Sequence, residues 1–368
     1  MSQKIRVGIL FGGKSAEHEV SLQSAKNVVE AIDKNKYEVV LLGIDKQGRW
    51  YLNEASRFLL NADNPKLISL NKANENVALV TGKSGKQRLV SLSDNKSFGP
   101  IDVVFPVLHG PFGEDGTIQG LLKLANVPFV GASVLGSAIG MDKDVMKRLL
   151  REAGIPMAGF LVFPRASSHE IDFEAVKSQL GVPMFIKPAN LGSSVGIHKV
   201  SDQPHFDQAV QDAFQYDTKI IIEEAIAGRE IECSVLGNEN PIASVPGEII
   251  PQHEFYSYEA KYIDEHGAIL EIPAKLPEEI VKQVQELAIK AFKVLCCEGM
   301  ARVDFFLRND QEVLVNELNS IPGFTRISMY PKLWEVSGIS YTQLIDRLIH
   351  LALERFEREK KLKTSVEL

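Results

Sequence analysis

Cysteine is scarce in this sequence. The 368 residues include only three, and while Cys296 and Cys297 are adjacent, Cys233 is remote from both. They therefore form neither the CxxC pair of a metal or redox site nor the spaced set of a disulfide framework. Because free thiols are typical of reducing compartments, we expect a cytoplasmic protein.

Long hydrophobic runs are missing too. No apolar stretch approaches the ~18 residues of a membrane-spanning helix, and the run at residues 7–11 is followed by Gly-Gly-Lys rather than by a cleavage site with small residues. The sequence thus predicts no signal peptide and no membrane partner.

An excess of positive charge is also absent. The 41 Lys and Arg residues are outnumbered by 48 Asp and Glu, which gives a formal net charge of −7. We therefore expect no nucleic-acid partner, although one groove of such a protein can still be basic. The composition, 45% hydrophobic and 24% charged, excludes a mainly disordered chain, and the length suits two or three domains.

The hydrophobic pattern predicts an α/β fold. Buried strands at 5–11 and 37–44 flank an amphipathic helix, and the order strand, helix, strand is typical of a parallel sheet. Further strands at 101–110 and 127–131 complete a Rossmann-like first domain, which we expect to end at residue 138.

The rest of the chain predicts helices and antiparallel strands. Asp142 is a good N-cap for one helix, and Pro277 is a good first residue for another. Two strands at 300–307 and 312–319 are joined by a polar turn. The polar stretch at 83–97 predicts an exposed loop or a hairpin.

One motif near the N-terminus is misleading. The segment GILFGGKS at 8–15 matches the phosphate-loop expression GxxxxGK[ST], in which the intervening residues wrap phosphates with their N–H groups. Here Ile9, Leu10 and Phe11 continue a strand, so too few residues remain to encircle a phosphate chain. We expect a tight strand-to-helix turn instead.

The strongest chemical signal lies in the C-terminal hairpin. A period of two puts Arg302 and Asp304 on one face of the first strand, and Glu317 and Asn319 on one face of the second. Two carboxylates and an amide oxygen are hard ligands suited to Mg²⁺ or Mn²⁺. The alternative is that these residues simply face water, but Asp and Asn are poor strand residues.

Three further segments suggest a nucleotide site. Lys187 ends an apolar strand before the Gly/Ser-rich loop 189–196, which offers a cation and backbone donors to phosphates, although a solvated surface lysine has a similar pattern. A strand that runs into Glu223 and Glu224 fits a purine and ribose site or an ordinary strand end. The aromatic loop 255–262 is typical of a lid or ligand wall, and equally of core packing.

Seven segments, taken in order, resemble those of the D-alanine–D-alanine ligase family of ATP-grasp enzymes. They are GGKSAEHEVSLQSA, HGPFGEDGTIQG, MDKDVMKRLL, FIKPANLGSSVG, YEAKY, ARVDFF and NELNSIPGFT. The resemblance covers nearly the whole chain and implies an ATP-grasp fold of two α+β subdomains preceded by the Rossmann-like domain. The domains would be 1–138, 139–226 and 227–368, the last with a mobile loop at 251–271.

The resemblance also implies which residues hold ATP and metal ions. The expected ATP-binding residues are Lys143, Lys187, Ser194, Glu223, Glu224, Ala225, Ile226, Glu230, Phe255 and Lys261. The lysines would hold phosphates, the segment 223–226 would line the adenine site, and Glu230 would bind the ribose. Two Mg²⁺ or Mn²⁺ ions would bind Asp304, Glu317 and Asn319, with Glu317 bridging them.

The residues that the resemblance implies for D-alanine and for catalysis form a second set. They are Glu17, His109, Ser193, Tyr262, Arg302, Ser328 and Met329. Glu17 would bind the ammonium of the first D-alanine in a cluster with Ser193 and Tyr262, and His109 would lie beside the amino-acid subsites. The carboxylate of the second D-alanine would bind at residues 328 and 329, where a leucine is commoner than the methionine found here.

The implied reaction has two steps. The first D-alanine attacks the γ-phosphate of ATP, giving D-alanyl phosphate and ADP, and the amine of the second then attacks the acyl carbon. Arg302 would stabilise the oxyanion, and closure of the mobile loop would exclude water. Tyr262 favours a D-amino acid over D-lactate as second substrate. The family further implies a homodimer that supplies a peptidoglycan precursor.

Two alternatives remain open at this point. Another ATP-grasp carboxylate–amine ligase would share the phosphate and metal residues, but it would leave the Glu17 turn and the YEAKY segment unexplained. A non-catalytic nucleotide-binding module would not need Lys187, Arg302 and Glu317, all of which are present. Release of ADP that depends on D-alanine discriminates between the three.

Overall fold

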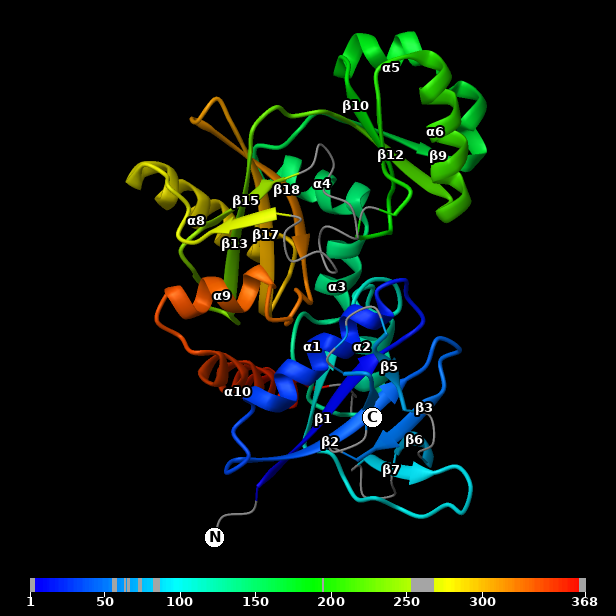
Figure 1. Cartoon of the computed structure of the whole chain (residues 1–368), viewed down its shortest axis with the longest axis vertical. Coiled ribbons are helices and arrows are strands. Elements are labelled where there is room, and N and C mark those ends of the chain that lie inside the picture. Colours follow the sequence, from blue (N-terminus) through cyan, green and yellow to red (C-terminus); the bar gives the residue numbers. More distant parts are fainter. Residues whose placement is uncertain are drawn as a thin grey trace.

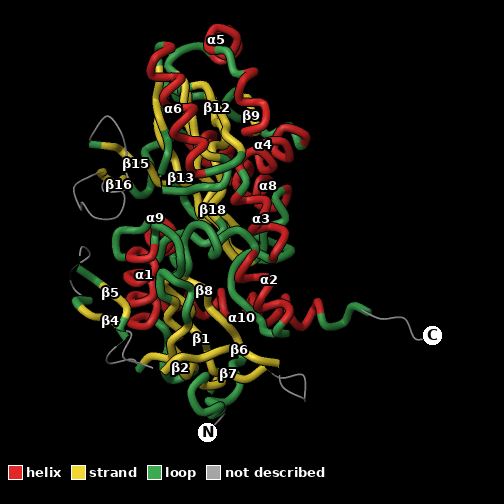
Figure 2. The backbone as a smooth tube through the Cα atoms, turned by 90° about the vertical axis from the view of Figure 1, so that its right-hand side faces the viewer, coloured by secondary structure: helices red, strands yellow, loops and turns green. Residues whose placement is uncertain are grey.

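Three main sheets lie in different parts of the molecule (Figure 1). The computed structural model describes residues 4–363 except 55–57, 63, 65–66, 72–74, 82–86, 194 and 253–267. In the view of Figure 1 the first sheet is at the bottom, the second at the upper right and the third at the upper left. Figure 2 shows the same stacking from the side.

The first sheet has six strands in the order β7-β6-β3-β2-β1-β8. They are β1 (Ile5–Gly12), β2 (Tyr37–Ile44), β3 (Trp50–Asn53), β6 (Glu75–Thr81), β7 (Gln87–Ser91) and β8 (Val103–Val107). As predicted, β1 pairs in parallel with β2, because helix α1 (His18–Ala31) forms the crossover. Helix α2 (Thr117–Leu124) and the pair β4 (Leu59–Leu60) and β5 (Ser69–Leu70) complete this part.

The turn after β1 uses its N–H groups internally. Residues 9–11 continue the strand, as predicted. The N–H of Gly12 donates to Ser21 Oγ at 2.7 Å, and the N–H of Gly13 donates to the carbonyl of Ile44 at 2.8 Å. These donors are therefore not available to a phosphate.

One of two further expectations for this part needs revision. Residues 127–131 form no strand, because only an isolated bridge joins them to β8, and Pro128 has no N–H for a ladder. For the polar stretch at 83–97 the predicted alternatives are an exposed loop and a hairpin, and the hairpin is correct, because residues 87–91 form β7, which pairs with β6. Val77 and Leu89 of this hairpin are buried, so it extends the sheet and its core.

The second sheet is antiparallel, in the order β11-β10-β12-β9. Its strands are β9 (Phe160–Pro164), β10 (Met184–Pro188), β11 (His198–Val200) and β12 (Lys219–Glu224). A 3-10 helix (Arg165–Glu170) and the helices α5 (Phe173–Leu180) and α6 (Gln203–Tyr216) accompany it. The two α-helices pack their apolar sides on one face of the sheet, so the other face is available to a ligand.

The third sheet has the order β16-β15-β13-β17-β18, with β14 pairing β13 at the side. Its strands are β13 (Arg229–Gly237), β14 (Ile242–Ala243), β15 (Gly247–Pro251), β16 (Ala268–Glu271), β17 (Gly299–Arg308) and β18 (Glu312–Asn319). Helix α8 (Glu278–Val294), which follows Pro277 as predicted, covers one face together with α4 (Lys143–Glu152). Helix α3 (Val134–Met141) contacts β18, and α9 (Met329–Val336) contacts β13.

Helix α10 (Tyr341–Glu359) packs against the first part of the molecule, although it lies near the end of the chain. Its apolar face shares one core with β1 and β8, and Phe105 of β8 meets Phe324 with ring centroids 5.8 Å apart. The distant ends of the chain therefore stabilise each other. Within the described part of the chain, no helix has the length and apolarity needed to cross a membrane.

Arg355 of α10 is a specific link in this packing. Its side chain is only 4% exposed, it donates to the carbonyl of Phe129 at 2.7 Å and to that of Gly131, and it stacks on the Phe129 ring at 4.5 Å. Both acceptors belong to the segment at 127–131, which has little sheet pairing of its own.

We expect Arg355→Met to destabilise the protein by about 2–4 kcal/mol, because it leaves two buried carbonyls without donors. Thermal and urea unfolding would measure the loss. Arg347→Met, at an exposed position of the same helix, is the matched control and should change stability by less than ~0.5 kcal/mol. Equal stability of the two variants would contradict a structural role for Arg355.

Candidate active site

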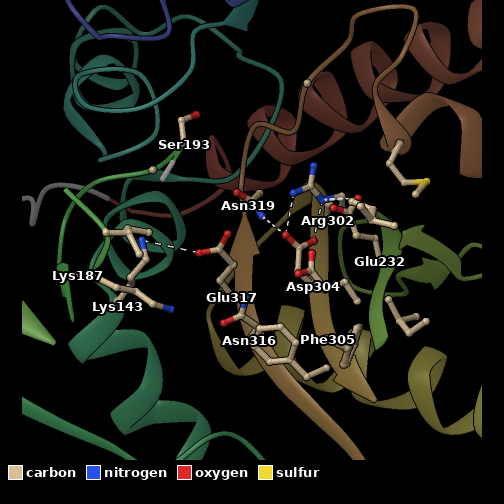
Figure 3. Close-up of a pocket in the computed structure, with 18 of the residues that line it drawn as sticks. Lys143, Lys187, Ser193, Glu232, Arg302, Asp304, Phe305, Asn316, Glu317 and Asn319 are labelled. Atoms are coloured by element: carbon tan, nitrogen blue, oxygen red, sulfur yellow. Dashed lines mark hydrogen bonds and ion pairs between the residues drawn. The ribbon is translucent and has the colours of Figure 1, made fainter. Parts of the chain in front are cut away.

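A cavity between the second and third sheets is lined by all three parts of the chain. The charged and polar residues that line it include Glu17, Glu114, Lys143, Lys187, Ser193, Glu223, Glu230, Glu232, Arg302, Asp304, Asn316, Glu317, Asn319 and Ser328. Figure 3 shows lysines on one side of this space and the carboxylates of β17 and β18 on the other. The arrangement brings cations and anions face to face across the cavity.

The polar residues of the hairpin share one face, as predicted. Asp304 lies directly opposite Glu317 in the ladder, and Arg302 lies opposite Asn319. The ladder shifts register by one residue between Asp304 and Phe305, and Asn316 is the extra residue of this β-bulge. The bulge is what aims Glu317 and Asn319 at the cavity while Val313 and Val315 enter the core below.

Arg302 is held by two carboxylates. Its Nε and Nη2 each lie 2.7 Å from an oxygen of Asp304, and its Nε lies 2.9 Å from Glu232 on the neighbouring strand β13. Such a bidentate pair fixes the plane of the guanidinium. A fixed positive charge in a partly buried cavity is suited to stabilising a developing oxyanion.

The donor set of the hairpin fits a hard divalent cation. Asp304, Glu317 and Asn319 present two carboxylates and an amide on one face, and Asn319 Nδ2 donates to Asp304 at 3.0 Å. In the described ranges no group of three or more His, Cys, Asp or Glu side chains is arranged to bind one metal ion. A metal would therefore rely on these few protein ligands and on oxygens that a phosphate substrate brings, as is usual for Mg²⁺.

Two predicted phosphate lysines approach the cavity from different elements. Lys143 is the first residue of α4, directly after the N-cap Asp142, and its Nζ donates to the carbonyl of Leu191 at 2.6 Å and lies 3.8 Å from Glu317. Lys187 lies at the end of β10 and donates to Glu223 on β12. Both line the same cavity.

Glu223 lies between two lysines. Its second oxygen is 2.8 Å from Lys147, one helical turn after Lys143. Burial opposes ionisation of this carboxyl, but the charges of Lys147 and Lys187 outweigh it and lower the pKa of Glu223 to about 2. Burial also opposes the charged form of Lys187, but the charge of Glu223 outweighs it and raises the pKa of Lys187. Glu223 and Lys187 are therefore both charged at neutral pH.

The end of β12 carries the other predicted adenine residues. Glu224 accepts from the N–H of Gly159 at 2.8 Å, and the N–H of Ala225 donates to the carbonyl of Pro183. Glu224 and Ile226 line the cavity, as does Glu230 on β13. Ala225 is not among the lining residues, so only its neighbours face the space.

Glu17 joins the first part of the molecule to the second. It is the N-cap residue of α1, is 6% exposed, and accepts a hydrogen bond from Ser193 of the loop after β10. Gly110 packs against it with φ +72°, and a Cβ there would lie 2.6 Å from Glu17 Oε2. A glycine at 110 is therefore required for this close approach.

Glu114 is a cavity residue that sequence reasoning missed. Its carboxyl accepts from the N–H of Gly110 at 2.8 Å and from the N–H of Ile321 at 3.0 Å, so it bridges the first and third parts. Desolvation, followed by the charge of Glu17, raises the pKa of Glu114 to about 8. It lies in the glycine-rich segment HGPFGEDGTIQG.

The raised pKa of Glu114 predicts a specific pH dependence of stability. Between the ordinary value of 4.5 and about 8 the folded state holds a proton that the unfolded state has released. Raising the pH through this window should therefore lower stability, and the loss should be complete above pH 8. In Glu114→Gln, which cannot ionise, the decrease should be smaller by roughly 1–2 kcal/mol.

Thermal unfolding from pH 5 to 8.5 measures the slope of stability against pH. Glu335→Gln, at an exposed position of α9, is the control and should keep the wild-type slope. An unchanged slope in Glu114→Gln would show that this carboxyl ionises normally.

His109 is buried and does not line the cavity. Its ring contacts Ser24 Oγ through Nε2 and the carbonyl of Ile321 through Nδ1, both at 3.1 Å. Burial lowers the pKa of His109, although the charge of Glu17 opposes this. The ring is therefore a neutral link behind Glu17 rather than a group that faces a substrate.

Ser328 and Met329 lie at the N-terminus of α9 and line the cavity. Ser328 Oγ accepts from the N–H of Thr325 at 3.0 Å, and Met329 is buried. Four predicted site residues fall outside the part of the chain that the structure describes. They are Ser194, Phe255, Lys261 and Tyr262, with most of the loop at 251–271.

Two partners of the cavity's charged residues were also missed, Lys147 beside Glu223 and Glu232 beside Arg302. Lys147 follows Lys143 by four residues on a predicted helix, so helical spacing alone could have identified it. Glu232 follows Glu230 by two residues on a predicted strand, and the period of two could have placed it on the cavity face.

Comparison with known proteins identifies the family. Residues 6–132 match the family model described as D-ala D-ala ligase N-terminus, and residues 149–350 match that described as D-ala D-ala ligase C-terminus. A D-alanine–D-alanine ligase of Oceanobacillus iheyensis is 60% identical over 362 residues, which cover 98% of this chain and 99% of the relative.

Solved structures agree with this match. The D-alanine–D-alanine ligase from Coxiella burnetii has a TM-score of 0.85 at 40% identity, over 98% of this chain and 97% of that one. The ligase from Bacillus anthracis, solved as a complex with ATP, has a TM-score of 0.72 at 28% identity, over 97% and 100%. The chain therefore belongs to the D-alanine–D-alanine ligase family and has its ATP-grasp fold.

Proposed function

We propose that this chain joins two molecules of D-alanine at the expense of ATP, through a D-alanyl phosphate, to supply a dipeptide for peptidoglycan. The observation that carries the proposal is the single cavity in which Glu17, the lysines and the hairpin carboxylates meet. The family match supports the choice of D-alanine over other amino acids. The same match argues against the two alternatives, another carboxylate–amine ligase and a non-catalytic module.

The nucleotide would bind between the second and third sheets. Lys143 and Lys187 would hold its phosphates, with the loop after β10 supplying backbone donors and Ser194 a hydroxyl. The adenine and ribose would lie at the end of β12 and beside Glu230, and Phe255 and Lys261 would complete the site. Binding of ATP by the Bacillus anthracis relative supports this assignment.

The first D-alanine would bind at the junction with the first sheet. Glu17 is a buried carboxylate at the cavity wall and would receive the ammonium group, with Ser193 and Tyr262 fixing its position. The second D-alanine would direct its carboxylate to the N-terminus of α9 at Ser328 and Met329, where the helix dipole favours an anion. Tyr262 would favour its amino group as nucleophile.

The chain's own groups would then carry both steps. Lys143 and Lys187 neutralise the charge on the phosphates while the first carboxylate attacks, and Arg302 stabilises the oxyanion when the second amine adds to the acyl carbon. Asp304, Glu317 and Asn319 would hold two divalent cations, which would supply further charge neutralisation for the phosphates. Exclusion of water by the segment at 251–271 would protect the acyl phosphate.

We also propose three domains, a homodimer and a cytoplasmic location. The division into 1–138, 139–226 and 227–368 is supported by the three sheets, each of which draws its strands from one range, although α3 crosses residue 138. A homodimer is supported by exposed leucines on neighbouring helices, since Leu124 of α2 is 85% exposed and Leu135 of α3 is 57% exposed. Light scattering of the purified chain measures the assembly.

A coupled assay of ADP release tests the function. We expect turnover with ATP, Mg²⁺ and D-alanine, none with L-alanine, and formation of the D,D-dipeptide by mass spectrometry. Release of ADP with no dipeptide would contradict the second step. ATP binding without ADP release for any D-amino acid would favour a non-catalytic module.

A further inference from the structure

Lys147 is a buried cation that the proposed mechanism does not use. Its side chain is only 1% exposed, and it is not among the residues that line the cavity. It lies on α4 between Met146 and Leu150, two residues that pack in the core beneath the third sheet. The backbone that carries Lys147 is therefore anchored to the third sheet.

The charged end of Lys147 points to a different sheet. Its Nζ lies 2.8 Å from Glu223 Oε1 on β12 of the second sheet, and it approaches the Phe160 ring at 5.7 Å. Both side chains are almost fully buried, with 1% and 4% exposed. The contact is thus a close pair of opposite charges between the two sheets.

Glu223 consequently has two counterions of different kinds. Lys187, which contacts its other oxygen, lines the cavity, while Lys147 lies behind it. If Lys187 turns toward the phosphates of ATP, it leaves Glu223, a residue that is 3% exposed. A buried carboxylate without a partner is strongly destabilising, so this exchange requires a second cation that stays.

We propose that Lys147 is a positioning residue that acts as the permanent counterion of Glu223, so that Lys187 can exchange Glu223 for a nucleotide phosphate. This inference rests on the proposed function, because it takes Lys187 to be a phosphate ligand. Lys147 itself touches neither nucleotide nor amino acid. Its effect is on the free energy of ATP binding and not on the chemical steps.

The substitution Lys147→Met tests the proposal. Without its permanent counterion Glu223 should retain Lys187, and the dissociation constant for ATP should rise by about tenfold or more. Because the chemical steps do not use Lys147, kcat at saturating ATP should stay within about threefold of wild type. Arg148→Met is the matched control, since it removes an equal charge from an exposed position of the same helix, and ATP affinity should be unchanged.

A second background separates this role from a merely structural one. In Glu223→Gln there is no carboxylate to neutralise, so adding Lys147→Met should change ATP affinity by less than about threefold. If the Lys147–Glu223 pair only stabilised the packing of α4 on β12, Lys147→Met would instead lower the melting temperature and leave ATP affinity as in wild type. If Lys147→Met does not fold, Lys147→Gln, which removes the charge but keeps a donor, serves in both backgrounds.

Calorimetric titration of ATP without D-alanine gives the decisive result. Unchanged ATP affinity in the Lys147 variants, or an equal loss in the Glu223→Gln background, would overturn the proposal, and so would a wild-type protein that binds no ATP. Failure of the proposed function is a distinct outcome. It would appear as normal ATP binding with no D-alanine-dependent ADP release, and the titrations would still decide the role of Lys147.

Discussion

Glu317→Gln should reduce ligation by about 10³-fold or more while the fold remains intact. Glu317 lies opposite Asp304 at the cavity face of the hairpin and within 3.8 Å of Lys143. The substitution keeps the size of the side chain but removes the charge that the proposed pair of cations would share. Loss of one anionic ligand weakens hard cations most, because they bind through charge.

The measurement is kcat in the coupled ADP assay, together with a Mn²⁺ titration followed by electron paramagnetic resonance. Glu312→Gln is the control, because Glu312 lies on the same strand but is exposed and pairs with Arg308 at 2.7 Å. It should retain wild-type activity. Wild-type turnover or Mn²⁺ affinity in Glu317→Gln would refute the metal assignment.

Arg302→Lys should lower kcat by about 10²–10³-fold with little change in ATP affinity. A lysine keeps the positive charge beside Asp304 and Glu232, so the two carboxylates are not left unpaired. It cannot reproduce the bidentate contact at 2.7 Å, which fixes the direction of the guanidinium. The expected loss is therefore in stabilisation of the transition state rather than in folding.

Steady-state kinetics and circular dichroism check this expectation. Arg308→Lys, at the exposed end of the same strand, should be indistinguishable from wild type. A rise in KM for ATP with unchanged kcat would place Arg302 in nucleotide binding instead of oxyanion stabilisation.

Much of the hairpin could be predicted from the sequence because alternation in β17 is regular. Its residues face core and cavity in turn, and a period of two places Arg302 and Asp304 correctly. The bulge in β18 could not be predicted, since strict alternation puts Val315 and Glu317 on the same face. Only pairing with β17 shows where the extra residue is inserted.

Long-range contacts explain most of the remaining misses. Glu114 becomes a bridging residue of the site because the N–H of Ile321, 207 residues further along the chain, donates to its carboxyl. Residues 127–131 carry the apolar pattern of a strand, yet Arg355 supports them in place of a ladder. In both cases the partner is too distant in sequence for a local pattern to reveal it.

The bulge at Asn316 has a consequence for how this strand can vary. It shifts the alternation by one residue. Every second residue before the bulge, Val313 and Val315, therefore packs in the core, and every second residue after it, Glu317 and Asn319, faces the cavity. Deleting this one residue would leave the composition of the strand almost unchanged. It would nevertheless turn either Glu317 into the hydrophobic core or Val313 and Val315 toward the cavity. No side-chain substitution can compensate for such a shift, because it belongs to the backbone.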